Sequence, residues 1–320
     1  MSHHARFASA LLALAAGAML AGPAHAADNT RYVSITGSNA NPCTLAQPCK
    51  TLQRGINVTP AGGELRILDS GDYGANGNIK KSLTISGNGN TIFVANGIVI
   101  NKADAVVALR GLVLDGQGTI ENGIRIEVAA AVHIERYTIH DFTGNGIPLA
   151  TPVVGLQVFV LDSISRDNGG SGLGAALAGG QALATIDNSR FENNGGNGIA
   201  FGNGRITIRR STASGNGGQG ILVVVGEAMI MSTIAAHNGQ TGFNANANGR
   251  MVIESSAASG NGTHGLNVFT SGSARISNST FSRNATGINN GGAVETRENN
   301  TVTDNTTNLS GNALTPLDGI

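Results

Sequence analysis

The sequence predicts an all-β chain, a single right-handed parallel β-helix of about ten coils with a short capping helix at its N-terminal end. Three observations support this fold: a turn-rich composition, a glycine–apolar pair recurring every 22 to 26 residues, and apolar residues alternating within each interval. The chain has 47 glycines and no tryptophan in 320 residues, which disfavours a domain of long helices. Many short strands joined by tight turns fit this composition better.

The charge balance argues against polyanionic partners. Lysine plus arginine and aspartate plus glutamate number 20 each, so the formal net charge is zero. A chain without a strong field does not attract nucleic acid or an anionic membrane surface. We therefore expect no nucleic-acid partner.

The first 26 residues have the features of a cleaved signal peptide. A short basic start precedes an apolar run over 8–20 and a small-residue cleavage site at 24–26. A membrane anchor is the alternative, but the run is shorter than the ~20 residues that a spanning helix needs. We expect a mature chain from Ala27, exported to the periplasm or the exterior, without an integral membrane segment.

Residues 27–62 are expected to form an N-terminal cap. Export implies an oxidising compartment, and Cys43 and Cys49 are close in sequence, so we predict one local disulfide. A metal site would need two more ligands nearby, and that stretch contains none. After the second cysteine, Leu52 and Ile56 share one helical face and could cover the first coil.

The repeat itself is visible from self-comparison. Its glycine–apolar pairs begin at Gly97, Gly123, Gly146, Gly172, Gly198, Gly220, Gly242, Gly265 and Gly287. Apolar residues alternate within each interval, as in Ile206-Thr207-Ile208, which is the period of a half-buried strand. Three short strands fit in one interval, with Gly and Asn in the corners because they tolerate positive φ. The repeats extend over 63–310 and leave 311–320 as a C-terminal tail.

A second landmark is an asparagine at one position of successive coils. These residues are Asn168, Asn194, Asn216, Asn238, Asn261, Asn284 and Asn305. Stacked side-chain amides can bond to one another and to turn backbone, so we interpret the column as a structural ladder rather than a ligand-binding stripe. We likewise assign the inward apolar residues, including Phe191, Phe201, Phe243 and Phe281, to the core.

Other repeat folds fit less well. A leucine-rich repeat has a similar period and an internal asparagine, but the leucine framework and any helical segment are missing. A left-handed β-helix needs a hexapeptide rhythm, which is also absent.

The chain resembles the pectate-lyase-like right-handed β-helices, in particular exported bacterial proteins of the right-handed β-helix repeat type. The resemblance covers essentially the whole mature chain. Its carriers are the segments 41–52 and 62–74 and the repeats with their asparagines. It implies the β-helix fold. The wider superfamily consists mostly of polysaccharide lyases, hydrolases and epimerases, while many relatives of this subgroup have no assigned activity.

Catalytic motifs of that superfamily cannot be transferred to this chain. The Asn-Thr-Asp, Asp-Asp, Gly-His-Gly and Arg-Ile-Lys motifs of polygalacturonase-like members, which supply paired carboxylates, are missing. The nearest fragment is Thr263-His264-Gly265, which has no acidic partner in its turn. Lysines stop at Lys102, so a lyase base within the repeats would have to be an arginine.

Residues at one coil position become lateral neighbours, and one set of six forms a candidate site that we call the His140 patch. They are Asp115, His140, Asp141, Arg166, Asp167 and Glu192. Such a patch could hold Ca²⁺ against a uronate carboxylate while His140 or Arg166 removes a proton in a β-elimination. We favour the simpler interpretation of a solvated turn face with opposite charges paired between coils.

A second candidate column accompanies the strand that, in each repeat, comes before the strand of the His140 patch. It contains Glu135, Arg136, Asp162, Asp187, Arg209 and Arg210. Its signs alternate, which suits a cross-coil salt ladder more than a catalytic centre, although superfamily enzymes keep their groove on a comparable face.

Three hypotheses for function follow. The first is an exported β-helix whose long flank binds polysaccharide or faces the cell envelope, with no cofactor. The second is a lyase or hydrolase acting on acidic, uronate-containing glycans, with Ca²⁺ possible if it is a lyase. The third is a structural or adhesin-like rod. The lack of tryptophan and the 3 tyrosines count against a strong sugar-stacking surface. The sequence carries no signal for the oligomeric state.

Overall fold

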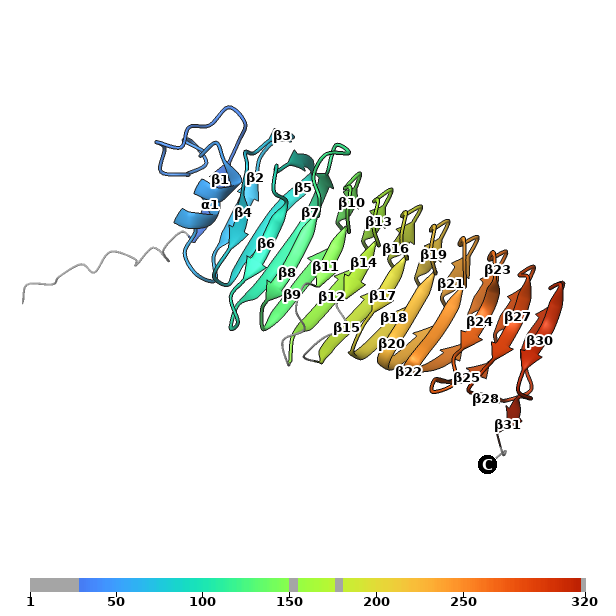
Figure 1. Cartoon of the computed structure of the whole chain (residues 1–320). Helices are drawn as coiled ribbons and strands as arrows, with labels where there is room; N and C mark the ends of the chain where they lie inside the picture. Colours follow the sequence, from blue (N-terminus) through green and yellow to red (C-terminus); the bar gives the residue numbers. More distant parts are fainter. Residues whose placement is uncertain (1–28, 150–154, 176–180, 318–320) are drawn as a thin grey trace, which may run out of the picture.

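The computed structural model describes residues 29–149, 155–175 and 181–317, and the expected signal peptide lies outside these ranges. The described chain winds into a parallel β-solenoid of about 11 turns (Figure 1). All of the paired strands run parallel, at a sequence separation of about one repeat. The predicted all-β coil is therefore confirmed. No helix in the described ranges has the length and apolar character needed to cross a membrane.

Three parallel sheets run along the stack. Sheet A contains β1 (Thr30–Val33), β2 (Glu64–Ile67), β9 (Ala131–Glu135), β12 (Gln157–Leu161), β15 (Ala182–Asp187), β18 (Gly204–Arg209), β25 (Ser273–Ser277), β28 (Ala293–Thr296) and β31 (Thr315–Pro316). Sheet B contains β3 (Gly71–Asp72), β10 (Thr138–His140), β13 (Ile164–Arg166), β16 (Arg190–Glu192), β19 (Thr212–Ser214), β21 (Ile234–Ala236), β23 (Ala257–Ser259), β26 (Thr280–Ser282) and β29 (Thr301–Thr303). Sheet C contains β4 (Gly77–Ile79), β6 (Ile98–Asn101), β8 (Ile124–Val128), β11 (Ile147–Leu149), β14 (Leu173–Ala175), β17 (Ile199–Phe201), β24 (His264–Val268), β27 (Thr286–Asn290) and β30 (Thr307–Gly311).

Four long strands each belong to two sheets. The strands β5 (Leu83–Phe93) and β7 (Val106–Asp115) pass from sheet A into sheet B. The strands β20 (Ile221–Met231) and β22 (Phe243–Glu254) pass from sheet C into sheet A. In these coils the corner is a bend or bulge within one strand rather than a separate turn.

The core lies inside the coil and is built from every second residue of each strand. Ile206 and Ile208 point inward, and the neighbouring strands place Ala228 and Ile230 beside them. The four phenylalanines expected in the core are all fully buried. Stacked apolar side chains of successive coils remove their surface from water, at about 25 cal/mol for each Å² of apolar area.

The asparagine ladder is confirmed. Each side-chain amide from Asn168 to Asn284 donates from Nδ2 to Oδ1 of the next asparagine at 2.9–3.1 Å. The backbone N–H of each donates to the same oxygen. Each Nδ2 from Asn168 to Asn305 also donates to a carbonyl of the preceding coil, as from Asn238 to Ala213. The ladder pairs turn backbone that would otherwise be buried without partners.

A parallel ladder of hydroxyls follows the corner between sheets A and B. Its members are Ser163, Ser189, Ser211, Thr233, Ser256 and Ser279. Each hydroxyl donates to the carbonyl two residues earlier, as Ser163 Oγ does to Leu161 O at 2.8 Å. Most also accept an N–H from the preceding coil, as Ser189 Oγ does from Ser163 at 3.1 Å. These residues are the small polar positions that precede each asparagine in the sequence.

The recurring glycine is required by close packing. A Cβ added to Gly220 would lie 2.8 Å from the ladder nitrogen Asn238 Nδ2 and 2.8 Å from the carbonyl oxygen of Gly242. Gly198, Gly242 and Gly265 face the same collision, and none of them has a positive φ. The expectation that glycine serves positive φ is therefore wrong at these positions. The residues with positive φ lie mainly at the two corners that flank sheet B, and most of those other than glycine are Asp, Asn, Arg and Ser.

The N-terminal end is built differently. The helix α1 (Leu52–Val58) lies at the N-terminal end of the stack (Figure 1). Thr51 is its N-cap, and the side chains of Leu52 and Ile56 are buried. The predicted disulfide joins Cys43 to Cys49. The strand β1 precedes both cysteines and pairs with β2, so the first strand lies before the expected start of the repeats at residue 63. At the other end, β31 continues sheet A into the segment expected as a tail.

Candidate functional site

The His140 patch lies at the edge of sheet B and in the corner that follows it. The parallel register aligns Asp115, His140, Arg166 and Glu192 in one column of neighbouring strands. Asp141 and Asp167 follow in the corner with φ of 60° and 55°. The structure therefore brings the six predicted residues together along four successive coils.

Most charges of this patch are already paired, and mainly within one coil. The Nδ1 atom of His140 lies 2.7 Å from Asp141 Oδ2 and 4.0 Å from Asp115 Oδ1. Arg166 binds Asp167, and Glu192 lies 3.7 Å from Arg190. The expected pairing between coils is thus largely wrong, because sequence neighbours at the corner reach each other first. The His140 side chain is only 14% exposed.

The donor atoms of the patch fit calcium poorly. Ligand atoms of Asp115, His140 and Asp141 lie within 4.8 Å of one another. Calcium takes six to eight oxygen ligands, whereas this group offers two carboxylates and an imidazole nitrogen, with the cation Arg166 on the adjacent strand. Such a donor set suits a transition metal better. We derive no chemical step that uses calcium at this position.

The second column divides between a strand and a corner. Glu135, Asp187 and Arg209 point outward from sheet A in one register column, whereas Arg136, Asp162 and Arg210 occupy the corner with positive φ. Asp187 Oδ2 lies 3.4 Å from Arg209 Nη2 and 2.5 Å from Arg210 Nη2, which is the expected cross-coil pairing. Glu135 instead pairs with Arg110 at 3.1 Å, and Asp162 accepts from Asn188 at 2.6 Å.

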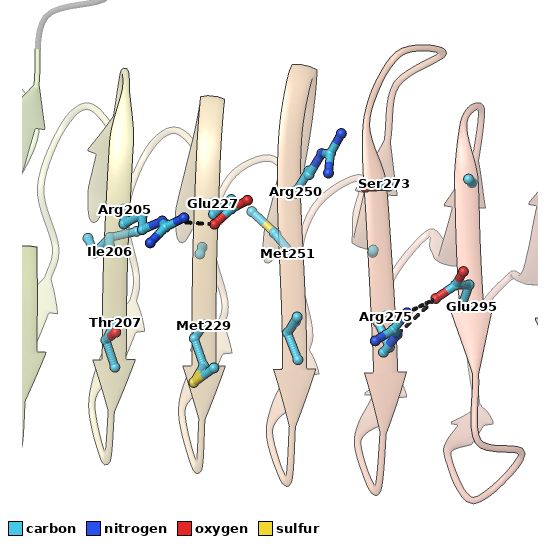
Figure 2. A pocket seen from close by; sticks show the side chains of 14 residues that line it. Arg205, Ile206, Thr207, Glu227, Met229, Arg250, Met251, Ser273, Arg275 and Glu295 are labelled. Atoms are coloured by element: carbon cyan, nitrogen blue, oxygen red, sulfur yellow. Dashed lines mark hydrogen bonds and ion pairs between the residues drawn. The ribbon is translucent and has the colours of Figure 1, made fainter. Parts of the chain in front are cut away.

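A hollow of about 680 Å³ lies on the outer face of sheet A over its C-terminal coils, and we call it the Arg250 trough (Figure 2). Its outward side chains come from five successive strand segments. They are Arg205, Thr207, Glu227, Met229, Arg250, Val252, Ser273, Arg275, Ala293 and Glu295. Met229 and Val252 are 48% and 40% exposed, so they give the floor of the trough an apolar centre.

Two ion pairs form in this trough, and the guanidinium of Arg250 takes part in neither. Arg205 Nε lies 3.0 Å from Glu227 Oε2, and Arg275 Nη2 lies 2.6 Å from Glu295 Oε2. Arg250 is the register partner of Glu227 but forms no ion pair or hydrogen bond through its side chain within the described part of the chain. In Figure 2 its side chain extends away from both pairs. The trough therefore has three cations, two anions and one cation available to a ligand.

Sequence reasoning missed this trough, although a signal exists. Its residues occupy outward positions of alternating strands, and adding 22 or 23 to Arg205 gives Glu227, Arg250 and Ser273 in turn. It also missed an aromatic pair on the same face, where the rings of His133 and Phe159 stack with centroids 4.6 Å apart. Both features lie on the strands of sheet A rather than at the asparagine corner, and nothing in their residue types alone distinguishes them from other outward positions.

Comparisons with known proteins agree with this architecture. The family model described as "Right handed beta helix region" matches residues 173–317. Among solved structures, pectate lyase Pel9A superposes with a TM-score of 0.60 at 17% identity, covering 88% of this chain and 78% of the lyase. The mannuronan C-5 epimerase AlgE4 A-module from Azotobacter vinelandii gives a TM-score of 0.58 at 13% identity, with 81% and 91% covered. A search of curated proteins finds no significant match.

The class of protein is thereby defined as a right-handed parallel β-helix. More particularly, the coil is similar in fold to those of pectate lyase Pel9A and the AlgE4 A-module. At these identities the likeness establishes the fold alone.

Proposed function

We propose that this protein is an exported polysaccharide-binding β-helix, and that the Arg250 trough binds acidic glycans. The observation that carries the proposal is the unpaired Arg250 guanidinium, which lies in the trough on the outer face of sheet A between two ion pairs. Guanidinium groups match carboxylates with two parallel hydrogen bonds. A uronate carboxylate is the corresponding group on an acidic polysaccharide.

The geometry of the trough suits an extended polymer. Adjacent strands of a sheet are ~4.8 Å apart, so five strands present about 20 Å of surface along the stack. Met229 and Val252 offer apolar contact to the C–H face of a sugar ring, although a tryptophan would offer more. Affinity would arise from repeated weak contacts along the chain rather than from one deep pocket.

The proposal of export rests on two features. The disulfide between Cys43 and Cys49 suits an oxidising compartment. The signal-peptide pattern over 1–26 supplies a route to the periplasm or the exterior. Two structural neighbours are a pectate lyase and a mannuronan C-5 epimerase, and pectate and mannuronan are acidic polysaccharides, which supports this ligand class.

Calorimetric titration with oligogalacturonate and oligomannuronate tests the proposal. We expect binding that weakens as salt is raised, because screening reduces the attraction between carboxylate and guanidinium. Arg250→Ala should weaken binding about 10-fold or more, since a hydrogen bond to a charged group contributes roughly 1.5–3 kcal/mol.

The matched control is Arg190→Ala, which removes a similarly exposed arginine from sheet B and should leave affinity unchanged. Equal affinity of the Arg250→Ala variant and the unmodified protein would refute the trough as the binding site. If no acidic glycan binds at all, a structural or adhesin-like rod becomes the better reading.

A uronate lyase or hydrolase is the second candidate. It is favoured by the position of His140 between Asp115 and Asp141, where an imidazole could move a proton. Incubation with pectate and alginate, with and without calcium, followed by detection of unsaturated or reducing-end products, tests this activity. Asp141→Ala and Asp167→Ala should then abolish product formation, whereas full activity in both would move the chemistry away from the His140 patch.

A further inference from the structure

A smaller hollow of about 350 Å³ lies on the outer face of sheet A toward its N-terminal end, and we call it the Ala108 notch. Outward side chains of β5, β7 and β9 line it, chiefly Thr84, Val106, Ala108, Arg110 and His133. The strands β12 and β15 separate β9 from the first strand of the Arg250 trough. The notch and the trough therefore belong to one continuous face of the stack.

The parallel register explains why this face is hollow at Ala108. One outward column contains Thr84, Ala108, His133 and Phe159 on four successive strands. Ala108 has only a methyl group, whereas the next position in the column is an imidazole ring. Neighbouring side chains of such a column are ~4.8 Å apart. A methyl group in place of a ring therefore leaves a space about one strand wide beside His133.

The imidazole ring of His133 is stacked on one side only. Its centroid lies 4.6 Å from that of the Phe159 ring, and the two ring planes differ by 9°. Because this distance is close to the strand spacing, the rings stack along the direction of the column. The other face of the imidazole is directed toward Ala108 and forms one wall of the notch. A ligand ring above Ala108 would continue the stack as a third ring.

The two edges of the notch differ in polarity. At one edge, Arg110 Nε lies 3.1 Å from Glu135 Oε2, so the charge of this guanidinium is balanced by its own ion pair. At the other edge, Val106 is 47% exposed. The notch thus offers a ring face, a methyl floor and an apolar edge, beside a guanidinium held in place. The C–H face of a sugar ring makes contacts of this kind.

We propose that the Ala108 notch is a ring-stacking subsite for one sugar residue of the acidic polysaccharide bound by the Arg250 trough, an inference that rests on the proposed function. From β7 to β22 there are six strand intervals along sheet A, which correspond to about 29 Å. A long oligomer lying along this face reaches both surfaces. Contacts at two points of one ligand raise its affinity, because the second contact forms within the complex.

Calorimetric titration of the full chain with a long oligogalacturonate tests this subsite. Ala108→Phe fills the notch with a ring of the protein itself and should weaken binding about 3- to 10-fold, the expected contribution of one stacked ring. His133→Ala removes the wall of the notch and should weaken binding to a similar extent. His133→Phe keeps a ring at that position and should bind normally.

The matched control is His237→Ala, which removes an exposed imidazole from a corner beside sheet B and should leave the affinity unchanged. Melting temperatures equal to that of the unmodified protein distinguish local loss of binding from misfolding. If His133→Phe binds as weakly as His133→Ala while both are folded, ring stacking is not the contact and the proposal is wrong.

Parallel titration of Arg250→Ala separates the subsite from the proposed function. Full affinity of Ala108→Phe and His133→Ala would overturn the subsite, even where Arg250→Ala binds weakly and supports the trough. Weak binding by the two notch variants together with full affinity of Arg250→Ala would refute the trough and support the notch. Absence of binding to any oligogalacturonate would overturn both.

Discussion

The N-terminal coils and the ladder coils have the same fold but satisfy their buried backbone in different ways. From Asn168 to Asn305, one side-chain amide per coil bonds to the next coil in an unbroken series, and most hydroxyls of the neighbouring ladder accept an N–H from the preceding coil. In the preceding coil, those two positions hold Phe142 and Tyr137, both buried. The N-terminal end has neither ladder. It contains the helix α1, the disulfide between Cys43 and Cys49, and a cluster of hydrogen bonds to Asp69.

The difference teaches which parts of a β-helix depend on repetition. In the ladder coils each polar group relies on the coil after it, so a single loss should spread along the stack. In the N-terminal coils each device is local. Tyr137 occupies a ladder position but does not continue the ladder, and its hydroxyl is buried without a hydrogen-bond partner among the described residues. Burial raises the pKa of this hydroxyl far above its usual range.

The largest effect is expected from Asn238→Ala, in the middle of the amide ladder. Without Asn238 Oδ1, both the backbone N–H and the side-chain amide of Asn216 lose an acceptor, and the carbonyl of Ala213 loses its donor. Three buried groups at about 1–2 kcal/mol each predict a loss of roughly 3–6 kcal/mol in the free energy of unfolding, measured by urea denaturation.

The ladder's dependence on its neighbours can be checked in the same variant. Hydrogen exchange should rise in the coils on both sides of Asn238, since each amide there pairs with this residue. Asn248→Ala, at an exposed amide, should change stability by less than about 0.5 kcal/mol. A loss for Asn238→Ala no larger than that of the control would contradict the structural role of the ladder.

Gly220→Ala should cost about 1–3 kcal/mol, because the new methyl group would meet the ladder nitrogen of Asn238 and the backbone of the next coil. Gly174 is a matched control, since a Cβ there would come no closer than 3.4 Å to another group. Comparison of the two melting temperatures measures the close approach directly. Equal melting temperatures would show that space does not explain the recurring glycine.

A smaller and more local effect is expected at Asp69. Burial alone would raise the pKa of this carboxyl, but hydrogen bonds from Ser34, Tyr73 and the Ile35 N–H lower it below its usual value. Asp69→Asn should cost about 1–2 kcal/mol at pH 7, because an amide accepts fewer of these bonds. Hydrogen exchange should rise around β1 and β2 but not in the ladder coils.

The effect at Asp69 has a defined pH dependence. A carboxyl with a lowered folded pKa stabilises the fold above its unfolded pKa of about 3.9, and that contribution is lost as pH falls through the folded value. The stability difference between the unmodified protein and Asp69→Asn should therefore be constant at neutral pH and shrink below about pH 4. If the stability difference between the two proteins is as large at about pH 2 as at neutral pH, the effect is due to packing rather than to the charge of Asp69.

Much of the fold was predictable because the spacing of the repeats in the sequence fixes the register of neighbouring strands in a parallel coil. A residue and its counterpart 22 to 26 positions later become neighbours, so the asparagine column and the outward column from Asp115 to Glu192 follow from the sequence alone. The disulfide was predictable for a similar reason, since its two cysteines are close in the chain. Both kinds of feature depend only on the separation of residues along the sequence.

Partner choice was not predictable, because one register column offers each side chain several partners. Glu227 lies between Arg205 and Arg250 in the register, and it binds Arg205. His140 binds its own sequence neighbour more closely than Asp115 across the coil. Side-chain rotamers and corner geometry decide these cases, and neither follows from position in the repeat.

The sequence by itself therefore determined the coil, its register and the asparagine ladder that stabilises it. These properties recur once in each repeat, and residues one repeat apart become lateral neighbours. The tertiary structure alone decided which charges cancel and which face a ligand. Arg250 is a candidate binding group because the neighbouring carboxylates pair with Arg205 and Arg275, and this availability depends on the three-dimensional surroundings rather than on residue type.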